Sequence, residues 1–261
     1  MNTWKMTYEL CCHFGSPVTG HAYSLRCFPR EMFHQRVQSC KYEVIPCSGG
    51  GRGRDSFGNS LLIGKNNEPH EWFLVRVDAV VAIENLEEPE LKPYYQLGMY
   101  RSPTKLTRTG DRLTEFISKI PKDQQCNPWE RTKVLMHELY AAFRYESGST
   151  GFQTTAEEAF SQGCGVCQDY AHILLALCRS EGLTVRYVAG TIPGEGETHA
   201  WMEVWHEGKW KGFDPTNDKE TDESYLTFAV GRDAEDCSLN RGVFMGAGNQ
   251  NQYIRCEMTP I

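Results

Sequence analysis

The first third of the chain alternates apolar and polar residues with the period of two that is typical of β-strands. Four stretches show this pattern and are rich in β-branched and aromatic side chains: TWKMTYELCCHF (3–14), AYSLRCFP (22–29), RVQSCKYEVIP (36–46) and EWFLVRVDAVVAI (71–83). The intervening SGGGRGRDSFGNS (48–60) lacks the Gly-Lys-Ser/Thr ending and the following apolar helix of a phosphate-binding loop, so we expect a flexible hairpin connection there. The pattern predicts an N-terminal antiparallel β-domain.

Further along, apolar residues recur at spacings of three and four, which predicts helices. Two such segments are GDRLTEFISKIP (110–121) and NPWERTKVLMHELYAAFRYES (127–147), the second opening with Asn127 as the N-cap and Pro128 at the first helical position. A short third helix is expected in TTAEEAFSQG (154–163), where Thr155 and Glu158 have capping-box spacing and Gly163 stops the helix.

The segment 84–96 is acidic, contains prolines and has no clear period, which suits a crossover between two domains. A length of 261 residues also favours two domains over one. We therefore expect a β-domain at 1–90 and a second domain at 91–261, giving an α+β protein.

Charge and composition exclude several classes of protein. The net charge of −7, with lysine and arginine scattered, provides no basic surface for nucleic acid. The N-terminus has no secretory leader pattern and no apolar run is long enough to span a membrane, so we expect a cytoplasmic protein without a membrane partner. The eleven cysteines, odd in number and irregularly spaced, are then expected to be mostly reduced.

The stretch GCGVCQDYAH (163–172) precedes the apolar run ILLALC and predicts a buried helix that begins near Cys167. A thiol at a helix N-terminus feels the positive end of the helix dipole, which favours the nucleophilic thiolate. The free N–H groups of the first turn can also stabilise an oxyanion. Cys167 is therefore a candidate nucleophile.

A base and an acid for this thiol are predicted from strand register. THAWMEVW (198–205) alternates, and a hairpin turn in the following HEGK would pair Trp205 with Trp210 and set Trp201 opposite Asp214. His199 would then lie diagonal to Asp214 on one face of the sheet, within reach of its carboxylate. If the Cys167 helix packs on that face, the three residues form a Cys-His-Asp triad.

These three segments, GVCQDYAHILLALC, THAWMEVW and WKGFDPTND, resemble the motifs of the transglutaminase-like superfamily, and in particular bacterial transglutaminase-like cysteine peptidases. The resemblance implies a papain-like core, in which a buried helix packs on an antiparallel sheet, and catalytic roles for Cys167, His199 and Asp214. It extends to GRDAEDCSLNRGVFMG (231–246) and to the N-terminal β-domain, and so covers most of the chain. The sequence departs from the family pattern at Ala234, where an aromatic residue is expected, and at Cys164.

The reaction expected from such a triad is acyl transfer from an amide through a thioester, with a peptide or protein as substrate and neither metal nor organic cofactor. We favour hydrolysis, which the resemblance implies; the alternatives are glutamine cross-linking or deamidation, and a non-catalytic peptide-binding domain. A redox or zinc pair of Cys164 with Cys167 is less favoured, because the sequence has no second Cys-x-x-Cys pair. His172 is expected to be a hydrogen-bonded core histidine, and Gln153 or Gln168 to supply a second oxyanion donor.

Overall fold

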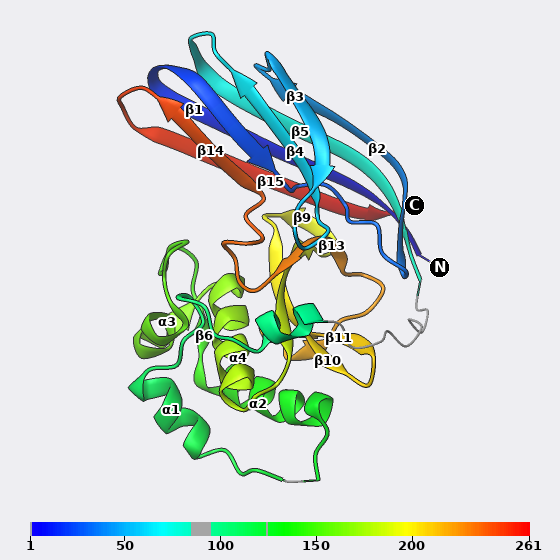
Figure 1. The fold of residues 1–261 in the computed structure, drawn as a ribbon, viewed down its shortest axis with the longest axis vertical. Helices are drawn as coiled ribbons and strands as arrows, with labels where there is room; N and C mark the ends of the chain where they lie inside the picture. The colour runs from blue at the N-terminus through cyan, green and yellow to red at the C-terminus, as the bar shows by residue number, and fades with distance from the viewer. Residues whose placement is uncertain (1, 85–94, 124) are drawn as a thin grey trace.

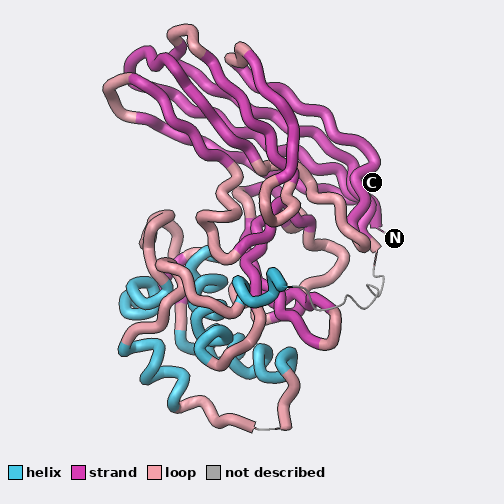
Figure 2. Tube along the Cα trace, viewed as in Figure 1, coloured by secondary structure: helices cyan, strands magenta, loops and turns pink. Residues whose placement is uncertain are grey.

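The structure, a computed structural model, describes residues 2–84, 95–123 and 125–261. One end of the molecule consists of strands, and the other combines the helices with a second, smaller sheet (Figures 1 and 2), which makes an α+β fold. The predicted crossover at 84–96 lies mostly outside the described residues.

An eight-stranded sheet forms the first part of the molecule. Its strands run in the order β2-β5-β1-β15-β9, while β14 and β4 pair with β1 beyond its bend and β3 pairs with β4. Their bounds are β1 Asn2–Leu25, β2 Gln35–Ile45, β3 Gly49–Arg54, β4 Ser60–Asn66, β5 His70–Ile83, β9 Gly194–Gly196, β14 Asn240–Met245 and β15 Gln250–Pro260.

Strand β1 organises this sheet because it is long enough to serve two sets of partners. Its first half pairs with β5 and β15, and after a register irregularity between residues 13 and 18 its second half pairs with β4 and β14. Gly20, at a φ of 57°, lies within this change of partners, where a side chain would be strained. The predicted strands 3–14 and 22–29 are thus largely one bent strand. The alternation predicted for it is present, since Met6, Tyr8 and Leu10 are fully buried.

The C-terminal strands lie outside the unit in which the sequence analysis placed them. Residues 240–260 were expected within the domain 91–261, but β14 and β15 hydrogen-bond to β1, and the two chain ends lie close together in Figure 1. The register pairs Trp4 with Pro260 and Phe14 with Gln250. Without β15, the first half of β1 would be an open edge with unpaired N–H and C=O groups. The first and the last strand of the described chain therefore both belong to the β-domain.

The segment 48–60 is a hairpin, as expected, but an ordered one. Its first half is strand β3, which pairs with β4. The turn is held by Asp55, whose carboxylate accepts hydrogen bonds from the N–H groups of Phe57 and Asn59 at 2.9 and 3.0 Å. These side-chain contacts hold the turn, and glycine content alone does not reveal them.

The second part of the molecule is a five-stranded antiparallel sheet in the order β12-β11-β10-β8-β13, covered by helices. The bounds are η1 Tyr95–Tyr100, α1 Asp111–Ser118, α2 Pro128–Ala142, α3 Ala156–Gln162, α4 Cys167–Ser180, β8 Val185–Thr191, β10 His199–His206, β11 Lys209–Asp214, β12 Lys219–Glu220 and β13 Leu226–Gly231, with the short parallel pair β6 Arg144–Tyr145 and β7 Cys164–Gly165. Helix α4 lies between the sheet and the helices α2 and α3, so its residues 169–179 are all buried. This is the predicted buried helix on an antiparallel sheet.

The predicted helix caps are confirmed, but α2 ends at Ala142, short of the predicted segment 127–147, and residues 144–145 form strand β6. Asn127 and Thr155 each cap a helix within a capping box, with Pro128 at the start of α2. Gly163 ends α3 in the left-handed conformation. None of the helices in the described ranges is both long and apolar enough to cross a membrane.

Two buried amide side chains join the β-domain to the edge of the second sheet. Gln35 donates to the carbonyl oxygen of Thr227 at 2.9 Å and accepts from its N–H at 2.8 Å. Asn59 makes the same pair of bonds with Val230, at 2.8 and 2.9 Å. Because both amides are fully buried and satisfy edge strand β13, they fix the orientation of the two domains.

Candidate active site

Helix α4 begins at Cys167, as predicted, and its start is held by an acidic side chain. Asp169 accepts hydrogen bonds from the N–H of Val166 at 2.8 Å and from Thr150 Oγ1 at 2.5 Å. Burial raises the pKa of this carboxyl, and the two hydrogen bonds oppose that effect. The Asp169 carboxylate thus ties the loop around Thr150 to the helix that carries Cys167.

Strands β10 and β11 bring His199 and Asp214 together. Trp205 pairs with Trp210, the predicted register. Nε2 of His199 lies 2.7 Å from Oδ2 of Asp214. The predicted histidine–carboxylate contact is therefore present.

Asp214 is fully buried and surrounded by donors. Its Oδ1 accepts from the N–H of Thr216 at 2.9 Å, and its Oδ2 accepts from Asn217 Nδ2 and from the Tyr225 hydroxyl, both at 2.7 Å. Burial acts to raise the pKa of Asp214, but these donors together with His199 hold it below its ordinary value. The carboxylate is therefore ionised at neutral pH and available to orient the imidazole. Sequence reasoning missed Asn217 and Tyr225, because a residue three positions past the strand and a tyrosine of another loop carry no motif signal.

His199 also interacts with the thiol of Cys167. Burial alone would lower the pKa of His199, but its hydrogen bonds and charge interactions with Asp214 and with the Cys167 thiol raise it to about 9. Since Nε2 is bonded to Asp214, Nδ1 is the atom that meets the thiol. The imidazole is thus largely protonated at neutral pH, next to the Cys167 sulfur.

A pH dependence follows from this raised pKa. An imidazolium that must protonate a leaving amine loses that ability as pH rises, so we expect kcat/KM for amide turnover to fall above a pH of about 9. Alkylation of Cys167 by iodoacetamide needs only the thiolate and should not fall there. Parallel pH profiles of the two reactions, with circular dichroism to monitor folding, test this; an alkaline decline in both would contradict it.

Two cavities open on the two sides of the Cys167–His199 pair. The first, of about 270 Å³, is lined by apolar and amide side chains, some of them from the C-terminal segment, among them Phe152, Leu239, Asn240, Gln252 and Ile254. The second, of about 500 Å³, is lined by Tyr145, Ile192, Pro193 and two glutamates, Glu195 and Glu197. Cys167 and His199 line both, so a chain lying along this cleft would pass the thiol.

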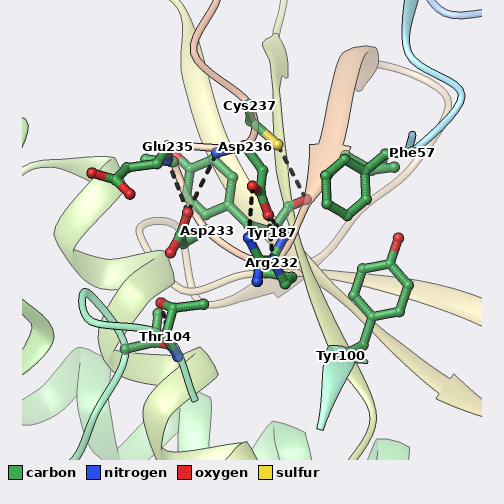
Figure 3. Close-up of polar contacts among 12 residues, drawn as sticks. Phe57, Tyr100, Thr104, Tyr187, Arg232, Asp233, Glu235, Asp236 and Cys237 are labelled. Carbon is green, nitrogen blue, oxygen red and sulfur yellow. Dashed lines mark hydrogen bonds and ion pairs between the residues drawn. The ribbon is translucent and has the colours of Figure 1, made fainter. Parts of the chain in front are cut away.

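The segment after β13 supports the wall of the first cavity. Figure 3 shows Arg232 paired with Asp236, Asp233 accepting from the backbone of the turn, and Cys237 directed at Tyr187. The N–H of Ala234 donates to His172 Nε2 at 3.1 Å.

His172 is fully buried, and burial lowers its pKa to about 3. It is therefore a neutral, hydrogen-bonded core histidine, as expected.

The other predicted residues have partners of their own. The Gln153 side chain donates to Glu235 Oε1 and that of Gln168 to the carbonyl oxygen of Phe152, each at 3.2 Å. Cys164 is buried, with Gln162 Nε2 at 3.6 Å from its sulfur. Tyr145, missed by sequence reasoning, lies beside the thiol: burial raises its pKa, and the charge of Cys167 adds to that effect.

Comparison with known proteins agrees with this geometry. The family model described as "Transglutaminase-like superfamily" matches residues 116–215, and "Bacterial transglutaminase-like N-terminal region" matches residues 5–82. The chain belongs to the transglutaminase-like superfamily and carries the N-terminal region of its bacterial members.

Its relatives include uncharacterized proteins of Mycobacterium leprae, 30% identical over 95% of both chains, and of Mycobacterium bovis, 29% identical over 87% of this chain and 82% of that one. The crystal structure of "a Putative Cysteine Protease from Cytophaga hutchinsonii" superposes with a TM-score of 0.83 at 20% identity, covering 100% of this chain and 91% of that one. The predicted fold class is thereby confirmed, and the superposed length includes the C-terminal strands that pair with β1.

Proposed function

We propose that the protein hydrolyses amide bonds in a peptide or protein substrate through a thioester on Cys167. The observation that carries the proposal is the half-buried His199, hydrogen-bonded to Asp214 at 2.7 Å and to the Cys167 thiol, with its pKa raised to about 9. A purely binding domain would have no need of an ionised acid, a cationic imidazole and a thiol in line.

In the first half-reaction the Cys167 thiolate attacks the amide carbonyl carbon. The N–H of Cys167, at the first turn of α4, has no intrahelical acceptor and is free to stabilise the resulting oxyanion. His199 gives its proton to the amide nitrogen as the C–N bond breaks, which releases an amine and leaves a thioester on Cys167. Asp214 stays ionised and keeps the imidazole oriented.

In the second half-reaction water attacks the thioester carbon. Neutral His199 accepts a proton from that water, the C–S bond breaks, and a carboxylic acid leaves while the thiolate and imidazolium are restored. The same thioester could instead be attacked by an amine. We favour water because the structural neighbour with a TM-score of 0.83 is titled "a Putative Cysteine Protease".

Chemical labelling with product analysis tests the proposal. We expect iodoacetamide at pH 6.5 to label Cys167 faster than Cys47, the exposed thiol among the eleven free cysteines. Wild-type protein should cleave members of a peptide mixture, detected by mass spectrometry as fragments with a new carboxylate. Cleavage should disappear in Cys167→Ala and persist in the matched Cys164→Ala. Equal labelling of the two thiols together with intact peptides would refute the proposal, and amine adducts would replace hydrolysis by transfer.

A further inference from the structure

Two glutamates lie in the walls of the cleft that holds the thiol. Glu197 lines both cavities, together with Cys167 and His199, and Glu195 lines the larger one. Neither cavity is lined by a lysine or arginine of the described residues.

The two glutamates differ in what they contact. Glu195 pairs with Arg255 at 2.9 Å, within the β9–β15 pairing, so its charge is already compensated. Glu197 makes no hydrogen bond or ion pair within the described part of the chain. Its charge is felt inside the cleft, since it contributes to raising the pKa of Tyr145 in the wall of the larger cavity.

The position of Glu197 links this free carboxylate to the reacting bond. It lies two residues before His199 and directly after β9, whose pairing with β15 holds the approach to β10 on the β-domain sheet. An extended peptide with its carbonyl carbon at Cys167 would therefore bring a neighbouring side chain to this carboxylate. Glu197 is exposed to solvent, so a cationic side chain that pairs with it gains a modest, salt-sensitive stabilisation.

We propose that Glu197 is a specificity-determining residue that selects peptides carrying a lysine or arginine side chain within about two residues of the scissile amide. The inference rests on the proposed amide hydrolysis and deepens it by naming the substrate class. A cationic nitrogen could be drawn to Glu197 in either of two roles: as a side chain of the peptide that is cleaved, or as the free or lysyl amine that accepts the acyl group. The test below separates these two roles.

Matched peptides that differ at one position, lysine, norleucine or glutamate, provide the test. We expect wild-type protein to prefer lysine over norleucine by about fivefold in kcat/KM at low ionic strength, the size of effect that a single partly exposed ion pair supports. In Glu197→Gln this ratio should fall to about one, and in Glu197→Lys the glutamate peptide should become the preferred one. High salt should weaken the wild-type preference.

The control is Glu207→Gln, which removes the same charge from a side chain that is 80% exposed in the turn after β10, away from the cleft. It should leave the lysine-to-norleucine ratio unchanged. Binding of the same peptides to Cys167→Ala, followed by fluorescence anisotropy, gives the preference without turnover.

Equal kcat/KM and equal binding for the lysine and norleucine peptides would overturn the specificity proposal while leaving hydrolysis intact. A second outcome would refute hydrolysis but support the specificity proposal. In that case no peptide is cleaved, yet Cys167→Ala binds the lysine peptide preferentially and loses this preference when Glu197→Gln is added. A lysine-dependent product that is an amine adduct rather than a fragment would assign the cation to the acceptor and overturn the substrate version.

Discussion

Replacing His199 by alanine is expected to lower kcat for amide turnover by about 10²- to 10⁴-fold, the contribution of a positioned general acid and base. The variant loses both the proton donor for the leaving amine and the cation that pairs with the Cys167 thiolate, which the raised pKa of His199 records. Alkylation of Cys167 at pH 6.5 should slow in the same variant. Peptide mass spectrometry of the labelled protein measures this site by site.

The control is His137→Ala. This histidine is 73% exposed on α2 and pairs with Asp218 at 2.8 Å, so its removal deletes an imidazole and an acid contact without touching the cleft. Both rates should stay within about twofold of the wild type, as for other surface substitutions. Unchanged alkylation and turnover in His199→Ala would mean that the contact with Cys167 is structural.

Replacing Arg179 by methionine is expected to lower the free energy of unfolding by about 3 to 5 kcal/mol. The guanidinium is buried, 5% exposed, and donates to four acceptors: Tyr100 O at 3.1 Å, Thr107 Oγ1 at 2.6 Å, Val185 O at 3.2 Å and Arg232 O at 2.7 Å. Burial lowers its pKa to about 10, so it remains charged at neutral pH. Methionine fills similar volume but removes all four of these hydrogen bonds.

The expected loss is a large share of the roughly 5 to 15 kcal/mol that stabilises a typical domain. Urea unfolding followed by tryptophan fluorescence measures it, with the exposed Arg112→Met as the matched control, for which about 0.5 kcal/mol or less is expected. A loss below about 1 kcal/mol in Arg179→Met would show that water reaches these acceptors.

Arg179 also connects helix α4 to the segment that forms part of the wall of the first cavity. It lies in the last turn of α4, the helix that begins at Cys167, and bonds to the backbone at the start of β8 and just after β13. Figure 3 shows two of the segments it joins, at Tyr100 and at Arg232, the second of which leads into the wall of the first cavity. Removing this residue should therefore loosen the cavity wall as well as the fold.

Helix ends and hairpin register could be predicted from the sequence, because they depend on residues that are close together along the chain. Asn127, Thr155 and Gly163 mark helix ends because a cap bonds to N–H groups only a few residues away. The contact of His199 with Asp214 was predictable for a similar reason, since a tight hairpin fixes register and register fixes which side chains share a face.

Contacts between segments that are far apart along the chain could not be predicted and are known only from the folded structure. The return of β14 and β15 to β1, the amide clamps of Gln35 and Asn59 on β13, and the donation of the Tyr225 hydroxyl to Asp214 each join elements whose approach no local pattern specifies. Glu197 is a further example, because nothing in the sequence distinguishes it from the other glutamates. The folded chain places it in the same cavities as Cys167, with no ion-pair partner among the described residues. The physical reason is that caps and hairpins are closed by short-range geometry, whereas burial, edge pairing and the charge of a cleft arise when the whole chain has packed.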